Sequence, residues 1–178
     1  MTRHGGPIPL AIRWSHHPGK RHGRQAVRTR YRDPKVMSYT QMPTHHDVEE
    51  TRRVITKSFN VNDDRQTWLV AVQDSDDVIG LAGIRRSAPH SVAMGGLIGR
   101  PWWGTGFASE GVSVLLAALQ DNPEIYRAWA TCDIDNTRLL RLFDQRGFAF
   151  EGRLARHAVR LTIGPQPRDS LLYAKVLR

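Results

Sequence analysis

The stretch GRPWWGTGFASEG (residues 99–111) contains the pattern that decides the fold. Gly104 and Gly106 lie one residue apart, just after an apolar run and just before a helical pattern. Glycine permits tight turns that bring the backbone close to a ligand. A strand, a Gly-x-Gly turn and a helix together present free backbone N–H groups and the positive end of a helix dipole. The stretch therefore predicts a binding site for an anionic group such as a phosphate.

The periodicity on both sides of this stretch predicts alternating helices and strands. Thr44 is a candidate N-cap of the first helix, and Gly95-Gly96 marks a bulge or a close backbone approach inside a strand. The expected elements are helices over residues 44–59, 107–120 and 136–147, a hairpin over 67–86, and strands over 91–100, 125–133, 148–163 and 169–177. This order predicts one α+β (or α/β) domain around a mixed sheet.

Length and composition favour a single cytoplasmic domain. The chain has 178 residues, of which 40% are hydrophobic and 24% are charged, which is enough for one core of its own. No apolar run approaches the roughly 20 residues that a membrane helix needs, and the start lacks the apolar core of a signal peptide. The lone cysteine, Cys132, lies in an apolar run and predicts a buried structural thiol. We expect no metal and no membrane contact.

The net charge of +9 is concentrated at the start of the chain. Residues 1–32 hold eight Lys or Arg and no Asp or Glu, which leaves +1 for residues 33–178. The segment lacks spaced aromatics and a recognisable nucleic-acid-reading motif, so a solvated tail is the favoured interpretation. Docking on nucleic acid through the basic charges is the alternative. We expect residues 1–30 to form a basic segment that is poorly ordered, atypical or a mis-framed start, and residues 31–178 to form the folded domain.

A dinucleotide-binding fold is one interpretation of the two glycines. Gly104, Gly106 and Ser109 match a G-x-G-x-x-G pattern weakly, and Asp133 ends the next expected strand. However, the third glycine is missing, the letters RPWW separate the strand from the turn, and a hairpin precedes it instead of a second βαβ unit. The sequence therefore disfavours this fold.

Three segments together resemble the GNAT superfamily of N-acetyltransferases: GRPWWGTGFASEG, DNTRLLRLFDQRGFAFEG and DSLLYA. The branch that acetylates N-termini of ribosomal proteins has a similar turn, P-x-W-G-x-G-[YF]-A-x-E, and a following helix that runs from an Asn to a Gly-Phe pair. The matching residues are Pro101, Trp103, Gly104, Gly106, Phe107, Ala108 and Glu110 in the turn, and Asn136, Gly147 and Phe148 in the helix. The resemblance covers about residues 31–178. It implies the GNAT fold, a twisted mixed sheet flanked by helices, with two parallel strands that splay apart.

The resemblance also implies a site for acetyl-CoA as co-substrate. The pantetheine arm would lie in the opening between the strands that end near residues 98 and 133, with Gly95-Gly96 as the bulge that opens the sheet, or as a packing bulge only. The backbone at Leu97 and Ile98 would take the thioester carbonyl, and Asn136 would approach the pantetheine. Trp103 would pack the loop onto the core, and Trp102 would face the acceptor groove or solvent. The pyrophosphate would be held by the N–H groups of Trp103, Gly104, Thr105, Gly106, Phe107 and Ala108.

The implied reaction is direct attack of a neutral amine on the thioester. A lysine amine with a pKa of ~10.4 costs about 4.6 kcal/mol to deprotonate at pH 7, whereas an α-amine near ~7.8 costs about 1 kcal/mol. Glu110 and Asp133, or Asp135, are candidate bases, although a helix N-terminal charge and turn residues are the plainer interpretations. The family's Tyr before the Gly-Phe pair is Phe143 here, and its Ser three residues after the Asn is Leu139. Tyr126, Tyr173 or water are candidates for the missing acid.

These observations together predict an N-acetyltransferase. We expect it to move an acetyl group from acetyl-CoA to a primary amine, with a protein N-terminal α-amine ahead of a small-molecule amine such as a polyamine, antibiotic or amino acid. The alternative from another class is an acyl-CoA-binding module without turnover that docks on RNA through its basic segment. We expect a monomer or a homodimer.

Overall fold

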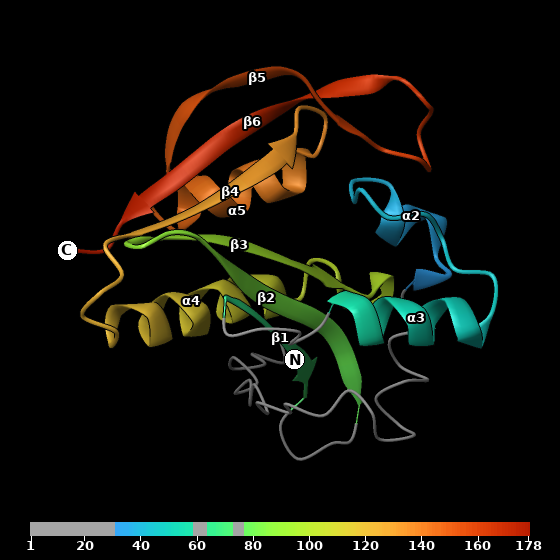
Figure 1. Cartoon of the computed structure of the whole chain (residues 1–178), viewed down its shortest axis with the longest axis horizontal. Helices are drawn as coiled ribbons and strands as arrows, with labels where there is room; N and C mark the ends of the chain where they lie inside the picture. The colour runs from blue at the N-terminus through green and yellow to red at the C-terminus, as the bar shows by residue number, and fades with distance from the viewer. Residues whose placement is uncertain (1–30, 59–63, 73–76) are drawn as a thin grey trace, which may run out of the picture.

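The computed structural model describes residues 31–58, 64–72 and 77–178 of the chain (Figure 1). The predicted basic segment over residues 1–30 lies outside the described residues. The described elements are α2 (Pro34–Met37), α3 (Val48–Ser58), β1 (Arg65–Ala71), β2 (Val78–Ala88), β3 (Ser91–Ile98), η1 (Arg100–Trp102), α4 (Phe107–Gln120), β4 (Arg127–Asp133), α5 (Thr137–Gln145), β5 (Ala149–Val159) and β6 (Pro167–Val176).

The six strands form one mixed sheet in the order β1-β2-β3-β4-β6-β5. The pairs β1–β2, β2–β3, β4–β6 and β5–β6 are antiparallel, and β3–β4 is parallel. This arrangement confirms the predicted mixed sheet with its leading hairpin. It also removes the dinucleotide-binding alternative, which requires a mainly parallel, doubly wound sheet.

The predicted bulge at Gly95-Gly96 is wrong, because the β2–β3 register runs without a shift from Gly80 opposite Ile98 to Arg86 opposite Val92. The alternative, a close backbone approach, is confirmed at Gly96. A Cβ built there would lie 2.6 Å from the carbonyl oxygen of Leu81, whereas one built on Gly95 meets nothing within 4 Å. Gly96 is therefore needed where β2 and β3 approach closely.

Helices cover both faces of the sheet. On one face, α4 and α5 bury Leu116, Leu119 and Phe143 against β4 and β6, and Phe107 and Leu115 against β1–β3. On the other face, Met37 of α2 and Ile55 of α3 pack against Leu69 and Leu81 of β1 and β2. Among the described residues, no helix is long and apolar enough to cross a membrane.

Two helix ends show how local sequence fixes the boundaries. The predicted N-cap at Thr44 is wrong, because α3 begins four residues later. Asp47 caps it instead, with Oδ1 accepting from the Glu50 N–H at 2.8 Å. The predicted stop at Gly147 is confirmed: its φ is +69°, and the Phe148 N–H closes the end of α5 by donating to the Phe143 carbonyl at 3.0 Å.

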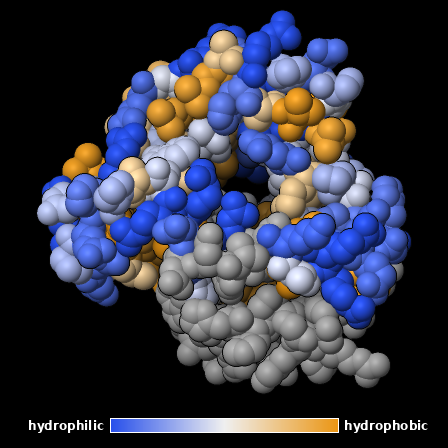
Figure 2. All heavy atoms as spheres, viewed as in Figure 1, coloured by the Kyte–Doolittle hydropathy of each residue, from blue (hydrophilic) through white to orange (hydrophobic). Residues whose placement is uncertain are grey.

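The parallel pair β3–β4 holds together over a short distance only. Ser91, Val92 and Ala93 pair with Arg127, Ala128 and Trp129, and the strands then diverge, so that β3 beyond residue 93 and β4 beyond residue 129 do not pair with each other. This confirms the predicted splay. Figure 2 shows the molecule hollowed at its centre, where Figure 1 places the ends of β3 and β4 and the neighbouring α2.

Candidate functional site

The turn before α4 presents a row of backbone N–H groups. Gly104 and Gly106 have φ values of +78° and +97°, which glycine adopts without the strain that a Cβ would bring. Gly106 is the N-cap of α4 and supplies no side chain to satisfy the first turn. In the described part of the chain, the N–H groups of residues 104–109 have no hydrogen-bond acceptor, and residues 104–106 and 108 are exposed. The residues fit an anionic ligand such as a pyrophosphate.

Trp103 ties this loop to the end of β3. Its indole Nε1 donates to the Ile98 carbonyl at 2.7 Å, and the Arg138 guanidinium lies 4.7 Å from the ring centroid. The neighbouring Trp102 is half-buried and packs against the cluster formed by Phe107 and its neighbours, so it is a scaffold residue rather than a groove residue. The Thr105 hydroxyl donates to the Trp102 carbonyl at 2.7 Å and closes the turn.

The end of β3 directs one backbone N–H into the opening between β3 and β4. The Gly99 N–H donates to the Ile79 carbonyl of β2 at 2.8 Å. Because N–H groups alternate between the two edges of an antiparallel strand, the Ile98 N–H lies on the edge that faces β4. The Leu97 backbone belongs to the ladder with β2, and its side chain packs beside Tyr31 and Met37. Of the two predicted residues, only Ile98 therefore offers its N–H to the opening.

Asn136 stands on the other side of the opening as the N-cap of α5. Its Oδ1 accepts from the Leu139 N–H at 3.3 Å, which leaves the donors of its amide nitrogen outside the cap. The preceding Cys132 is buried as predicted, and burial raises the pKa of its thiol to about 12. The thiol therefore stays protonated and unreactive at neutral pH.

Asp133 ends β4 as a buried carboxylate bound by arginine. Arg168 donates to both carboxylate oxygens, at 2.9 and 3.1 Å, and the Asp135 N–H donates to Oδ1 at 3.1 Å. Burial raises the pKa of Asp133, but the hydrogen bonds from Arg168 and Asp135 outweigh it and hold the pKa below its usual value. Asp133 therefore stays ionised and is a weak proton acceptor.

Glu110 lies on the first turn of α4, next to the loop. Its Oε2 is buried without a hydrogen-bond partner among the described residues. Phe107 and Gly111 face the sheet, and Ser109 accepts from Arg146 of the α5 end at 2.8 Å. The helical turn of about 100° per residue puts Glu110 between the sheet-facing side of α4 and the side of Ser109. No hydrogen bond or ion pair joins Glu110 to Asp133 within the described residues.

Comparison with known proteins identifies the architecture that these features form. The family model described as an acetyltransferase (GNAT) domain matches residues 20–149. The chain belongs to the GNAT acetyltransferase family. It is an N-acetyltransferase of the GNAT type, and acetyl-CoA is the co-substrate typical of such enzymes.

Three relatives illustrate the range of this GNAT family. An uncharacterized N-acetyltransferase, p20, from Bacillus licheniformis is 28% identical over 126 residues, which is 68% of this chain and 71% of that protein. The spermidine N-acetyltransferase of Vibrio cholerae, solved with CoA and spermine, has a TM-score of 0.79 at 16% identity and covers 94% and 95% of the two chains. RimL, a ribosomal L7/L12 alpha-N-protein acetyltransferase solved with coenzyme A, has a TM-score of 0.75 at 16% identity and covers 95% and 97%. Both solved structures have the same fold as this chain.

Of the tyrosines of this GNAT acetyltransferase, the two candidate acids Tyr126 and Tyr173 lie away from the opening or inside the core, whereas the Tyr39 hydroxyl donates to the Asp135 carbonyl at 3.4 Å. Tyr126 precedes β4 at the end opposite Asp133, where its ring meets His90 edge-on at 5.5 Å, so the structure does not bring it near Ile98. Phe143, which replaces the family's Tyr, is 4% exposed and packs 5.2 Å from the ring of Tyr173. Tyr173 is itself buried in this cluster, and burial raises its pKa.

Two arginines at the far end of the β5–β6 hairpin belong to the site but have no signal in the sequence. Arg168 and Arg160 meet Asp133 from positions 35 and 27 residues further along the chain. Only the antiparallel return of β6 beside β4, with Asp133 opposite Ser170, brings them together. Neither arginine lies in a motif, so no local pattern could have marked them.

Proposed function

We propose that this acetyltransferase acts on the α-amine of a protein N-terminus. The observation that carries the proposal is that Arg168 engages both Asp133 and Asp135, the two carboxylates at the mouth of the opening. A polyamine cation therefore finds no free buried carboxylate at this place. An α-amine has a pKa of ~7.8 and needs about 1 kcal/mol to lose its proton at pH 7, so it reacts without a strong base.

The residues that would hold acetyl-CoA follow from the geometry of the loop. The N–H groups from Gly104 to Ala108 would bind the pyrophosphate, whereas the Trp103 N–H already donates to the Arg100 carbonyl at 3.1 Å. The amide nitrogen of Asn136 would donate to the pantetheine. Acetyl-CoA supplies the acetyl group as a thioester. The Ile98 N–H is directed to the opening and would donate to an oxygen that becomes negative during transfer. The Trp103–Ile98 hydrogen bond fixes this N–H relative to the loop.

The acid–base groups of this proposal are carboxylates beside the opening. Glu110 stays a candidate base because its buried Oε2 has no partner among the described residues, and Asp133 is the weaker candidate because Arg168 holds it ionised. If Glu110 accepts the amine proton, Glu110→Gln lowers kcat at least tenfold while the Kd for acetyl-CoA stays within about twofold. Equal kcat in the variant and the native enzyme would remove Glu110 from the mechanism. Tyr126 is not proposed as the acid, because it lies at the far end of β4, and Leu97 is not proposed to bind the thioester, because its backbone pairs with β2.

Calorimetry with acetyl-CoA tests the coenzyme site. We expect binding by the native protein that is lost in Gly106→Glu, which places bulk and negative charge in the anion-binding turn. Gly152→Glu is the matched control, because a Cβ at Gly152 on β5 also meets nothing within 4 Å. Absence of binding by the folded native protein contradicts the proposed site.

Thiol release from acetyl-CoA tests the acceptor. The substrates to compare are a peptide with a free α-amine and no lysine, the same peptide acetylated at its N-terminus, and spermidine. We expect thiol release with the first peptide only. Faster turnover of spermidine would favour the small-molecule alternative, which the spermidine acetyltransferase fold neighbour makes worth including. Binding without turnover of either amine would favour the non-catalytic alternative.

A further inference from the structure

The face of the sheet opposite α4 and α5 carries a polar cluster beside the central hollow. On β4, Ala130 and Cys132 pack against the α5 side, so the alternation of the strand turns Thr131 and Asp133 to the opposite face. On β6, Tyr173 packs on the α5 side, and Ser170 faces the opposite side together with Asp133. If the coenzyme is held at the N-terminus of α4, this opposite face is the side from which the acceptor approaches.

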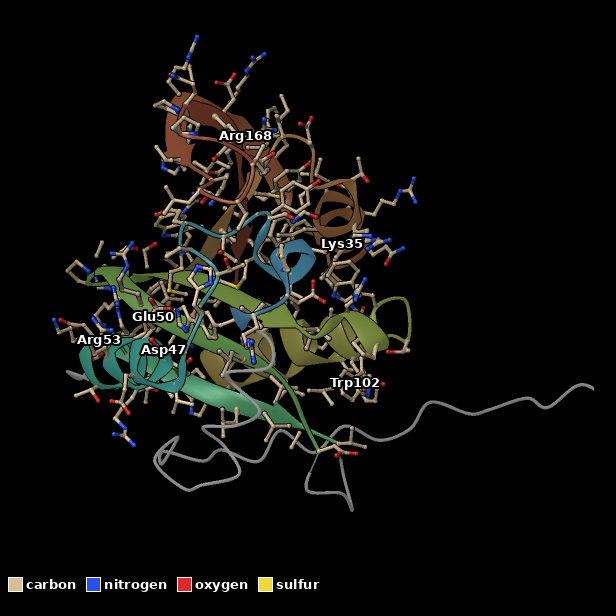
Figure 3. All side chains as sticks on the ribbon, turned by 90° about the vertical axis from the view of Figure 1, so that its right-hand side faces the viewer. Lys35, Asp47, Glu50, Arg53, Trp102 and Arg168 are labelled. Carbon is tan, nitrogen blue, oxygen red and sulfur yellow. The ribbon has the colours of Figure 1, made fainter. Side chains whose placement is uncertain are left out.

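The start of the domain and the end of the β5–β6 hairpin close over this face. The Thr162 hydroxyl donates to the Met37 carbonyl at 3.2 Å, and the Tyr39 hydroxyl donates to the Asp135 carbonyl at 3.4 Å. Figure 3 shows Arg168 on the upper part of the sheet, with Lys35 on α2 below it. The polar cluster therefore lies between α2 and the hairpin, next to the hollow seen in Figure 2.

The two carboxylates in this cluster are already occupied. Arg168 binds Asp133 through Nε and Nη2 and also reaches Asp135 Oδ2, and the remaining bond to Asp133 comes from the Asp135 N–H. Arg168 is thus paired with carboxylates on both sides. An incoming ammonium group would have to compete with it for each of them.

Arg160, in contrast, is a buried cation with few partners. The residue is 4% exposed, and its Nε has no hydrogen-bond acceptor among the described residues. Nε lies 3.6 Å from Asp133 Oδ2, an ion-pair distance that is too long for a hydrogen bond. Nη2 reaches the Ser170 hydroxyl at 3.5 Å, and that hydroxyl is shared with His157 Nδ1 at 3.1 Å. Within the described residues, this buried guanidinium with five donors has only these weak contacts and no strong hydrogen-bond acceptor.

We propose that Arg160 binds a carboxylate of the acceptor, so that the substrate is an amine that carries a carboxylate near its reacting nitrogen. A planar guanidinium matches a carboxylate with two parallel hydrogen bonds, and burial strengthens such a pair. The carboxylate is the side chain of an acidic N-terminal residue of a peptide, or the α-carboxylate of a free amino acid. The inference rests on the proposed function, because it places the acceptor on this face.

Two pairs of substrates test this recognition by thiol release. One pair is a peptide that begins with Glu and its twin that begins with Gln; the other is alanine and alaninamide. In at least one pair we expect the acid to exceed the amide in kcat/KM by about tenfold to a hundredfold, as for a hydrogen bond to a charged group. Arg160→Gln should bring this ratio close to one, and Arg160→Lys, which keeps the charge, should give a smaller loss.

The matched control is Arg153→Gln. Arg153 lies on the same hairpin, its side chain is 63% exposed, and it pairs with Asp169. This variant should keep the native ratio, and both variants should bind coenzyme A as the native protein does. Equal kcat/KM for acid and amide in both pairs overturns the proposal, and so does a preference that survives Arg160→Gln.

Product binding separates this proposal from the proposed function. The acetylated product of each acid and amide is titrated by calorimetry into the protein with coenzyme A present. A preference for the acid product that disappears in Arg160→Gln supports Arg160 as the carboxylate-binding residue, even if no peptide is turned over. If no peptide is turned over, only the proposal of a protein N-terminus as acceptor is contradicted. Preference within the peptide pair identifies an acidic N-terminus, and preference within the alanine pair identifies a free amino acid. Equal binding of acid and amide products by the native protein overturns the inference.

Discussion

Single residues decide how closely β2 and β3 approach, and Gly95 and Gly96 differ in what a side chain would meet. We expect Gly96→Ala to lower the free energy of unfolding by about 1 to 3 kcal/mol, because its Cβ would overlap the Leu81 carbonyl oxygen. Gly95→Ala should change it by less than about 1 kcal/mol, since the space there is open. Urea unfolding of the two variants makes the comparison. A cost for Gly95→Ala as large as that for Gly96→Ala would contradict the close approach.

Trp103 provides a second prediction at this scale. Trp103→Phe keeps an aromatic ring below Arg138 but removes the Nε1 donor to the Ile98 carbonyl. We expect the Kd for acetyl-CoA to rise about twofold to tenfold, the range of one lost hydrogen bond of about 0.5 to 1.5 kcal/mol. The melting temperature should change little, and Trp102→Phe, in the apolar cluster, should leave the Kd unchanged. Calorimetry checks both, and an unaltered Kd in Trp103→Phe removes the proposed coupling between loop and strand.

The residue scale also shows where sequence patterns are informative. Gly104 and Gly106 carry a local backbone requirement, a positive φ, and local requirements leave a readable spacing. Arg160 has no such local requirement, because its contact with Asp133 depends on the pairing of β4 with β6, which are far apart in the sequence. The sequence predicts Asp133 as the residue that ends a strand, but it does not predict the hydrogen bond from Arg168. Asp133 is therefore a weaker base than its position in the sequence indicates.

Elements were predicted better than their first residues. The position of α4 followed from its apolar spacing, and the end of α5 followed from Gly147, whose φ is positive. The start of α3 was misplaced because Thr44 and Asp47 are both good capping residues, and only the structure shows that Asp47 makes the bond. Similarly, paired glycines in a strand indicate either a bulge or a close approach, and the register decides between them.

The start of α3 carries a prediction on pH. His45 is buried, and its Nδ1 lies 3.0 Å from the Thr51 hydroxyl, which donates to the Asp47 carbonyl. Burial lowers the pKa of His45, an effect that Glu50 and Asp47 oppose and His46 reinforces. Because the folded state favours the neutral ring, this contribution to stability is complete above the unfolded pKa of ~6.5 and is lost as the pH falls below it.

Replacing this histidine should flatten that part of the pH profile. We expect His45→Asn, whose amide can still donate to Thr51, to reduce the decrease in the free energy of unfolding between pH 7 and pH 5. His90→Asn is the control, since His90 lies on the surface near Tyr126. Chemical denaturation at several pH values measures the slopes. Identical slopes for the native protein and His45→Asn would show that His45 does not titrate on unfolding.

For the whole molecule, the sheet is joined at its middle by three residue pairs between β3 and β4. Beyond them, the Gly96 and Ile98 N–H groups have no strand partner on the side of β4 in the described structure. We expect coenzyme A to slow amide hydrogen exchange at Ile98 and in residues 104–109 by at least tenfold, and to leave β5 unchanged. Exchange monitored by NMR with and without coenzyme A tests this. Protection confined to the outer surface of α4 would contradict insertion between the strands.

The burial of Cys132 has a practical consequence for anyone who studies this enzyme. The chain has one thiol, it lies on the central strand β4, and its pKa is raised to about 12, so an alkylating reagent cannot reach or activate it while the sheet is intact. Its alkylation rate therefore reports how often the core opens, and mass spectrometry can measure that rate from a single adduct. Thiol-release assays gain as well, because the folded enzyme contributes no background signal of its own.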